Sequence, residues 1–263
     1  MEIPNNVTMA LKRLHNLKKN IDKRELYDRY DQEINKLLKE GYAEPVPEEQ
    51  IEDKSLRILY LPHHAVITPK KPGKVRVVFD CAAKFCGESL NDKCLQGPDL
   101  NGKLIDVLLR YRQYPYVVMA DIEAMYYQVK IPEEQRNALR FLWYQEGELR
   151  HYRMTGHVFG GIWCASSSVY ALQRVIRDFE TSPLVQDTVL KSFYVDDCLR
   201  SVQDIQSAEE IVKECPAVLS KGGFNLTKFL VNVEEIQVSI PEEKRAKIEE
   251  DTLGRIVTKA LGV

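Results

Sequence analysis

The sequence has no C-x-x-C pair, no long apolar run and no excess of charge of one sign. Its six cysteines are scattered, and several lie in apolar runs, which favours reduced thiols over a disulfide-stapled or zinc-ribbon protein. No stretch reaches the roughly 18–20 apolar residues of a membrane span, and no signal-peptide core is present. The 37 Lys and Arg against 39 Asp and Glu exclude a basic coat over the whole surface but permit a local basic patch.

What is present is an ordinary globular composition, with 44% hydrophobic and 29% charged residues among 263. This length suffices for one large or two small cores. Residues 8–40 are predicted to be helical, with a capping box at Asp22 and Glu25 and a stop at Gly41. The residues after the box that share helical spacing are Leu26, Tyr30, Ile34, Leu37 and Leu38. The same spacing predicts a helix over residues 166–180.

Three hairpins are predicted from pairs of apolar runs that flank turn residues. The first covers residues 58–80 and turns at K-K-P-G, the second turns at Glu146-Gly147, and the third turns at Asp196-Asp197. Residues 114–122 form a short apolar run of the buried-strand kind. Hairpins mixed with helices, without regular βαβ alternation, favour an α+β fold.

Three further elements are expected near the C-terminal end of the sequence. Ser207 and Glu210 form a capping box for a helix that Gly222-Gly223 ends and Pro216 kinks. The run F-N-L-T-K-F-L-V is the last strand candidate, and one helix is expected from Pro241.

The acidic pair Asp196-Asp197 is the first candidate site. Tight hairpins usually turn through Asn-Gly or Asp-Gly, and two adjacent carboxylates repel each other. A divalent cation removes this objection, because hard cations bind carboxylate oxygens. A solvated acidic turn is the alternative. Asp121 decides between them, since it ends a predicted buried strand and would join the pair if the two strands are neighbours.

Three converging carboxylates can hold two Mg²⁺ ions about 3.5–4 Å apart, an arrangement that catalyses phosphoryl transfer. Such a site needs no protein nucleophile. The sequence agrees with this, because it contains no G-x-S-x-G elbow, no H-E-x-x-H helix and no Walker loop.

These residues stand in recognisable motifs. Tyr194-Val195-Asp196-Asp197, preceded by D-I-E-A-M-Y-Y-Q from Asp121, resembles the paired palm motifs of reverse transcriptases. The strings PHHAVITPKKPGKVRVVFDCAAKF, HVFGGIWCASSS and GGFNLTKFLVN look like the BEL/Pao class of LTR retrotransposon polymerases. The resemblance covers residues from about 45 to 232, and Cys164-Ala165 departs from it where Ser-Pro is usual.

The resemblance implies a right-hand polymerase fold of fingers and palm, with a small antiparallel palm sheet packed on helices and no thumb. The implied segments are an N-terminal helical segment (1–44), fingers with a basic hairpin and a long loop (45–113), a palm (114–232) and a short tail (233–263). Without a thumb, weak template binding and poor processivity are expected.

The resemblance also assigns site residues. Asp121, Asp196 and Asp197 would bind two Mg²⁺ ions, or Mn²⁺ in their place, with the Ile122 carbonyl as an extra ligand. Lys228 would protonate the leaving pyrophosphate, or else be a surface charge. The residues implied to bind the nucleotide are Lys71, Arg76, Tyr126, Phe159 and Gly160.

Each nucleotide-binding role has a physical reason and an alternative. Tyr126 would exclude a ribose 2′-hydroxyl, or be a core tyrosine. Lys71 and Arg76 would hold the triphosphate, or belong to a solvated basic hairpin that carries seven cations and one acid over residues 54–84. Phe159 would stack on a base, and Gly160 would permit close backbone approach.

Other aromatic residues receive structural roles. His63 and His64 are expected on opposite faces of a strand, with structural or template-facing roles rather than as metal ligands. Trp143 and Trp163 are expected in the core.

The leading hypothesis is an RNA-directed DNA polymerase domain of a retrotransposon. Its partners would be a primer–template of RNA or DNA, deoxynucleoside triphosphates and other parts of a Pol polyprotein (thumb, RNase H, protease, integrase), without a membrane. The expected location is intracellular, in cytoplasmic virus-like particles. Two alternatives stay open: a catalytically impaired remnant or nucleic-acid-binding module with the same fold, and another palm enzyme such as an RNA polymerase.

Overall fold

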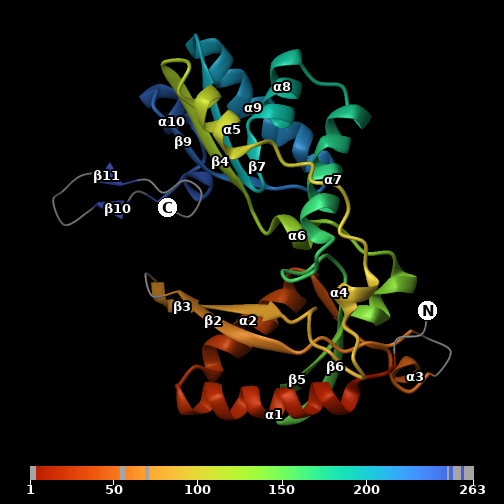
Figure 1. Cartoon of the computed structure of the whole chain (residues 1–263). Helices are drawn as coiled ribbons and strands as arrows, with labels where there is room; N and C mark the ends of the chain where they lie inside the picture. The colour runs from red at the N-terminus through yellow and green to blue at the C-terminus, as the bar shows by residue number, and fades with distance from the viewer. Residues whose placement is uncertain (1–3, 54–56, 69–70, 248, 251–255, 258–263) are drawn as a thin grey trace. The chain divides into compact units, whose positions relative to one another are not determined.

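The computed structural model describes residues 4–53, 57–68, 71–247, 249–250 and 256–257, with the side chains of 68, 71–73, 249–250 and 256–257 left outside the description. The chain divides into two compact units. Unit 1 comprises Met1–Gly97 and Tyr126–Cys164, and unit 2 comprises Pro98–Met125 and Ala165–Val263. Both mix helices with small antiparallel sheets, so the α+β prediction is confirmed (Figure 1).

Unit 1 holds a three-stranded sheet of order β1-β6-β5 and the hairpin β2-β3. Helix α1 packs on β2 and β5, and α2 packs on β3. The elements are α1 (Val7–Lys23), α2 (Tyr27–Lys39), β1 (Ala43–Pro45), α3 (Glu48–Ile51), β2 (His63–Thr68), β3 (Lys71–Phe79), α4 (Leu90–Lys93), α6 (Met125–Gln128, which begins in unit 2), η1 (Glu133–Leu139), β5 (Arg140–Gln145) and β6 (Glu148–Met154).

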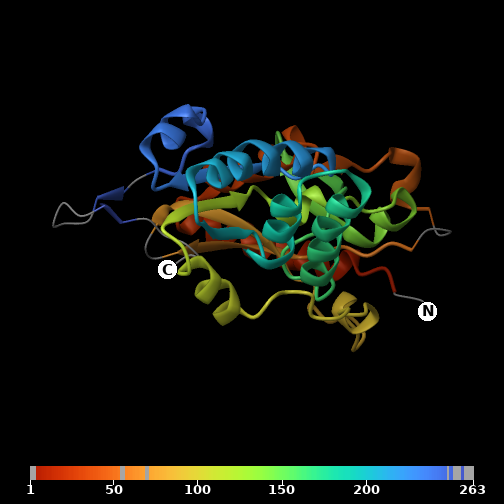
Figure 2. The ribbon, with the colours of Figure 1, turned by 90° about the horizontal axis from the view of Figure 1, so that it is seen from above.

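Unit 2 holds a four-stranded antiparallel sheet of order β7-β8-β4-β9. Helix α9 packs on β4, β8 and β9 and lies along the sheet in Figure 2. The elements are α5 (Leu104–Tyr111), β4 (Tyr116–Ile122), α7 (Cys164–Asp178, which begins in unit 1), α8 (Pro183–Lys191), β7 (Phe193–Tyr194), β8 (Asp197–Val202), α9 (Ile205–Lys221), β9 (Leu226–Val231), α10 (Glu234–Ser239), η2 (Glu242–Lys244), β10 (Glu249–Glu250) and β11 (Ile256–Val257).

An aromatic cluster fills the core of unit 1. Trp143 is buried, as predicted, and its ring packs on Tyr27 and Tyr30, whereas Trp163 is only partly buried. His63 is also buried: its Nδ1 lies 2.5 Å from the Tyr30 hydroxyl and its Nε2 lies 2.9 Å from the Leu142 carbonyl oxygen. His64 is exposed, which confirms that the two histidines point to opposite faces.

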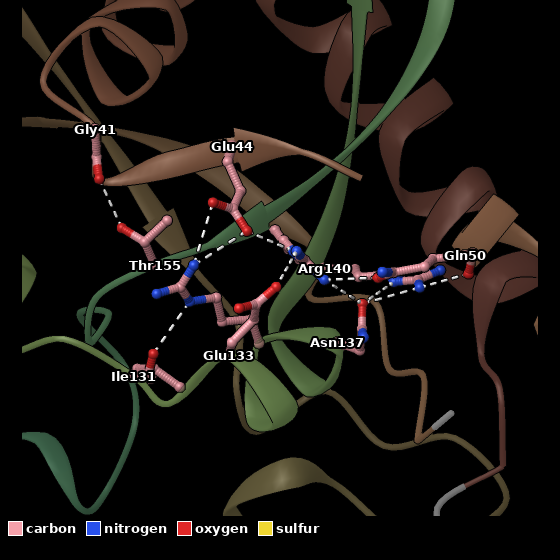
Figure 3. Close-up of polar contacts among 10 residues, drawn as sticks. Gly41, Glu44, Gln50, Ile131, Glu133, Asn137, Arg140 and Thr155 are labelled. Atoms are coloured by element: carbon pink, nitrogen blue, oxygen red, sulfur yellow. Dashed lines mark hydrogen bonds and ion pairs between the residues drawn. The ribbon is translucent and has the colours of Figure 1, made fainter. Parts of the chain in front are cut away.

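Buried arginines tie the loops of unit 1 to the hairpin β5-β6 (Figure 3). The fully buried Arg140 donates to the Gln50 carbonyl oxygen at 2.7 Å and to Asn137 Oδ1 at 2.9 and 3.0 Å. Its cross-strand partner Arg153 donates to Glu44 Oε1 at 2.7 Å. Because these guanidinium groups are hydrogen-bonded, their burial is compensated and their role is structural.

The N-terminal helical segment consists of two helices, and the second begins later than the predicted capping box indicates. Helix α1 ends at Lys23 and α2 begins at Tyr27, with Glu25 at φ 55° between them. Asp22 therefore lies in the last turn of α1, and the predicted capping box of Asp22 and Glu25 is wrong. The stop at Gly41 is confirmed, because this residue has φ 69° directly after α2.

Two further predictions about helices are wrong. Helix α9 starts before the expected box: Asp204 is its N-cap and accepts from the Ser207 amide at 2.8 Å. The tail has a short 3₁₀ turn (η2) after Pro241 instead of a helix, followed by the strand pair β10-β11.

Among the described residues, no helix is long and apolar enough to cross a membrane. All six cysteines are free, as expected.

Candidate functional site

Asp121 and Asp197 are cross-strand partners at one end of the unit 2 sheet. Asp121 lies near the end of β4 and Asp197 begins β8, and the antiparallel register places them directly opposite each other. Directly opposed side chains lie on the same face with Cβ atoms about 4.5–5.5 Å apart. The Ile122 amide donates to the Asp196 carbonyl oxygen at 2.8 Å, which fixes the third acid beside this pair. The three acids therefore lie at the same end of two neighbouring strands, with Asp196 in the turn that precedes β8.

The hairpin turn lies one residue earlier than predicted. Tyr194 pairs with Asp197, so the two-residue turn is Val195-Asp196 and Asp197 belongs to β8. Val195 has φ 55°, in the left-handed region that β-branched residues rarely adopt. Such backbone strain is often kept at functional sites. Here it lets Asp196 occupy the turn while Asp197 points to the face that carries Asp121.

The acids interact electrostatically. Burial raises the pKa of Asp196, the charge of Asp121 raises it further, and the charge of Lys228 lowers it. All three carboxylates are half-buried. This rim of the sheet therefore concentrates negative charge in partly desolvated surroundings, which attracts a cation.

Lys228 reaches the same acids from β9. Its Nζ donates to Asp121 Oδ1 at 2.8 Å, and the lysine side chain is 61% exposed. The contact brings Lys228 to the acidic residues, although the lysine side chain remains mostly in solvent.

The donor set agrees with a hard divalent cation in chemical type, because Mg²⁺ prefers carboxylate and carbonyl oxygens. The ammonium of Lys228 already contacts Asp121 Oδ1, where a metal cation would bind. The side chains are not arranged as a complete metal site: within the described residues, no group of three or more His, Cys, Asp and Glu is placed to hold an ion. Ile122 is the buried last residue of β4 and pairs with Leu226.

The aromatic pair Tyr126 and Phe159 lies in unit 1. Tyr126 belongs to α6, and its ring centroid is 4.6 Å from that of Phe159, with a tilt of 53° between the rings. Phe159 is 44% exposed. Tyr126 is half-buried.

Gly160 follows this pair at a position that requires glycine. Its φ is 115°, and a Cβ built there would stand 2.4 Å from the Phe79 carbonyl oxygen. The close approach is to the backbone of another segment of unit 1, and it explains the glycine without a nucleotide.

The basic hairpin is formed as predicted. Arg76 is exposed on β3 and pairs with Val66 of β2, and β3 begins at Lys71, inside the K-K-P-G string predicted to turn. The side chain of Lys71 and the whole of Lys54 and Lys70 lie outside the described residues. The predicted residues thus fall into two groups, with the acids and Lys228 in unit 2 and Arg76, Tyr126, Phe159 and Gly160 in unit 1.

Two features of the site were missed from the sequence. Asn225 donates to Glu123 Oε2 at 2.9 Å, and the Glu123 amide donates to the Asn225 carbonyl oxygen, which links the ends of β4 and β9. The left-handed Val195 was missed as well. Neither has a local signal, because Glu and Asn are common surface residues and valine normally marks extended backbone.

Comparison of the fold finds solved structures of foamy viral protease-reverse transcriptase. A complex with RNA/DNA hybrid matches with TM-score 0.55 and 18% identity, over 76% of this chain and 23% of that one. A complex with double-stranded DNA matches with TM-score 0.53 and 20% identity, over 75% and 35%. The native Prototype Foamy Virus protein matches with TM-score 0.53 and 17% identity, over 75% and 23%.

The chain therefore spans between about a quarter and a third of the length of those proteins. No family model matches the sequence, and no curated protein matches it. The likeness shows a reverse-transcriptase-like fold.

Proposed function

We propose that this chain is the RNA-directed DNA polymerase domain of a BEL/Pao-type retrotransposon. It would add deoxynucleotides to a primer 3′-hydroxyl by two-metal phosphoryl transfer. The observation that carries the proposal is the cross-strand pairing of Asp121 with Asp197, with Asp196 in the adjoining turn. Three acids at one rim of a small sheet are what this chemistry requires of a protein.

In this proposal the palm (residues 114–232) contains the four-stranded sheet of unit 2 together with β5 and β6 of unit 1, and the basic hairpin β2-β3 belongs to the fingers (residues 45–113). The likeness to reverse transcriptases of known structure supports a fold of this kind, whereas the two compact units of the chain have other bounds. The BEL/Pao assignment is supported only by the sequence strings around these elements.

Each site residue has one task. Asp121, Asp196, Asp197 and the Ile122 carbonyl would hold two Mg²⁺ ions, for which Mn²⁺ could substitute. When bound, such ions make the attacking hydroxyl more acidic and neutralise charge on the leaving pyrophosphate. The β4-β8 register sets Asp121 opposite Asp197, and the Lys228 ammonium would have to leave Asp121 Oδ1 for a cation to bind there.

The remaining residues would act on the nucleotide. Arg76 and Lys71 would bind its phosphates, Arg76 through a planar guanidinium suited to two oxygens. Tyr126 and Phe159 would contact the sugar and base, and Lys228 would deliver a proton to pyrophosphate. Gly160 would keep the backbone next to Phe159 close to Phe79.

The partners would be a primer–template, deoxynucleoside triphosphates and the other parts of a Pol polyprotein, in cytoplasmic virus-like particles. Two of the foamy viral structures are complexes with double-stranded DNA or RNA/DNA hybrid, which supports nucleic acid as the partner class.

The test is single-nucleotide addition to a primed RNA template, with Mg²⁺ and the full chain. We expect addition by the wild type and its loss in Asp196→Asn. Asp106→Asn is the matched control, because Asp106 is an exposed acid of unit 2 on α5. If the wild type binds Mg²⁺ and primer–template but adds no nucleotide, the proposed catalysis is refuted. The alternative of a nucleic-acid-binding module with the same fold then stands.

A further inference from the structure

Lys228 has an unusual backbone conformation for a strand residue. It lies inside β9, yet its φ is 53°, in the left-handed region that lysine seldom adopts. The pairing of β9 with β4 is interrupted at the same place: Met119 pairs with Leu230 and Asp121 pairs with Thr227, with a register shift between them. Two residues of β9, Lys228 and Phe229, therefore oppose one residue of β4, which is a β-bulge.

A bulge redirects a side chain relative to a regular strand. Here the redirected lysine donates to Asp121 Oδ1 at 2.8 Å, and the Asp121 side chain is 22% exposed. The flanking residues hold the strand in place, since Leu226, Phe229 and Val231 are buried. The strained conformation and the ion pair thus occur in the same residue, at the acids assigned above.

We propose, on the basis of the function proposed above, that Lys228 is a built-in counter-ion of the acidic site. Its ammonium neutralises Asp121 in the metal-free protein and leaves that carboxylate when a divalent cation binds there. Lys228 therefore regulates metal affinity, which is a task separate from proton delivery to a leaving group.

The electrostatic argument has two parts. Asp121 faces Asp197 across the strands, so an ammonium at Asp121 relieves repulsion between like charges. The same ammonium opposes a second cation at the same oxygens. When the ammonium leaves Asp121, the attraction between two unit charges is lost. At about 4 Å in water-like surroundings this attraction corresponds to about fivefold in an equilibrium constant, and Lys228 is exposed enough for this regime.

The experiment measures the affinity of the full chain for Mn²⁺ by electron paramagnetic resonance and by calorimetry. Lys228→Met removes the charge and keeps the length of the side chain. Lys228→Asn also removes the charge, and asparagine tolerates the left-handed backbone, so it separates charge from folding. Lys213→Met is the control, since Lys213 is an exposed lysine of unit 2 that pairs with Glu209 on α9.

We expect both Lys228 variants to bind Mn²⁺ about fivefold more tightly than the wild type, and Lys213→Met to bind it equally. If Lys228 has only a structural role, its replacement weakens Mn²⁺ binding or leaves it unchanged. Either result, found in both Lys228 variants, overturns the proposal. Suppose that Asp121→Asn loses the Mn²⁺ binding of the wild type, while both Lys228 variants keep the wild-type affinity. This result overturns the counter-ion role of Lys228 but not the proposed function. No specific Mn²⁺ binding by the wild type overturns the proposed function and this inference with it.

Discussion

Asp121 and Asp197 occupy directly opposed positions on β4 and β8, so two carboxylates face each other across one pair of strands. Like charges in this arrangement destabilise a sheet by roughly 0.2–1 kcal/mol. Lys228 offsets part of this repulsion at Asp121, and the negative charge that remains at the rim can attract a cation.

Replacing one of these acids should separate stability from function. We expect Asp197→Asn to raise the free energy of unfolding of the metal-free protein by about 0.5 kcal/mol, because repulsion is removed and the amide keeps a similar shape. The same variant should lose nucleotide addition. Urea denaturation with EDTA and the addition assay measure the two effects. A less stable, fully active variant would contradict both expectations.

Much of the fold was predictable where a local signal and the tertiary structure agree. The hairpin β5-β6 turns through Glu146 and Gly147 with φ 53° and 82°, and its flanking runs are apolar enough to predict both strands. The buried face of α2 was predicted from helical spacing, and Tyr30, Ile34 and Leu37 are all buried. In these elements propensity, pattern and burial agree.

Prediction was less accurate where tertiary contacts override local preference. The break at Glu25 lies in a good helical sequence, and the Val195 turn lies in a good strand sequence. The candidate site shows the same contrast. Asp121 and the acidic pair were found because each ends an apolar run, whereas the Lys228 bulge depends on register with β4. Register between strands distant in sequence has no local signature.

His63 should make the stability of unit 1 depend on pH. Burial lowers the pKa of His63 to about 4. The unfolded chain therefore takes up a proton near the ordinary pKa of about 6.5, while the folded chain does not until about pH 4. This contribution to the free energy of unfolding is complete above about pH 6.5 and is lost as the pH falls, by about 2 kcal/mol at pH 5.

The variant His63→Gln tests this dependence. Its unfolding free energy at pH 7 should be lower than that of the wild type, because hydrogen bonds to Tyr30 and Leu142 are weakened. Between pH 7 and pH 5 it should lose about 2 kcal/mol less. Urea denaturation at both values measures the difference. His64→Gln, on the exposed face of β2, should keep the wild-type dependence.

Gly160→Ala should destabilise the protein by about 3 kcal/mol. A side chain at φ 115° is strained, and its Cβ would meet the Phe79 carbonyl oxygen of the backbone, which cannot easily move. Gly147→Ala is the matched control: φ is 82° and the space is open, so only the conformational cost of about 1 kcal/mol is expected. Equal losses in urea denaturation would contradict the close contact.

The pairing of Tyr126 with Phe159 predicts how the chain would choose between sugars if it polymerises. The ring centroids are 4.6 Å apart, and such a pair is worth about 0.5–1.5 kcal/mol. We expect Tyr126→Ala to accept ribonucleotides at least about tenfold better relative to deoxynucleotides. Phe159→Ala should loosen the tyrosine and relax selection by about threefold to tenfold.

The measurement is kcat/KM for single addition of matched ribo- and deoxynucleotides. Tyr170→Ala is the control, because Tyr170 is an exposed tyrosine on α7 and its loss should leave selection unchanged. If the wild type uses both sugars equally well, Tyr126 does not exclude the ribose 2′-hydroxyl. If Tyr126→Ala relaxes selection and Phe159→Ala does not, the tyrosine selects the sugar without support from the phenylalanine ring.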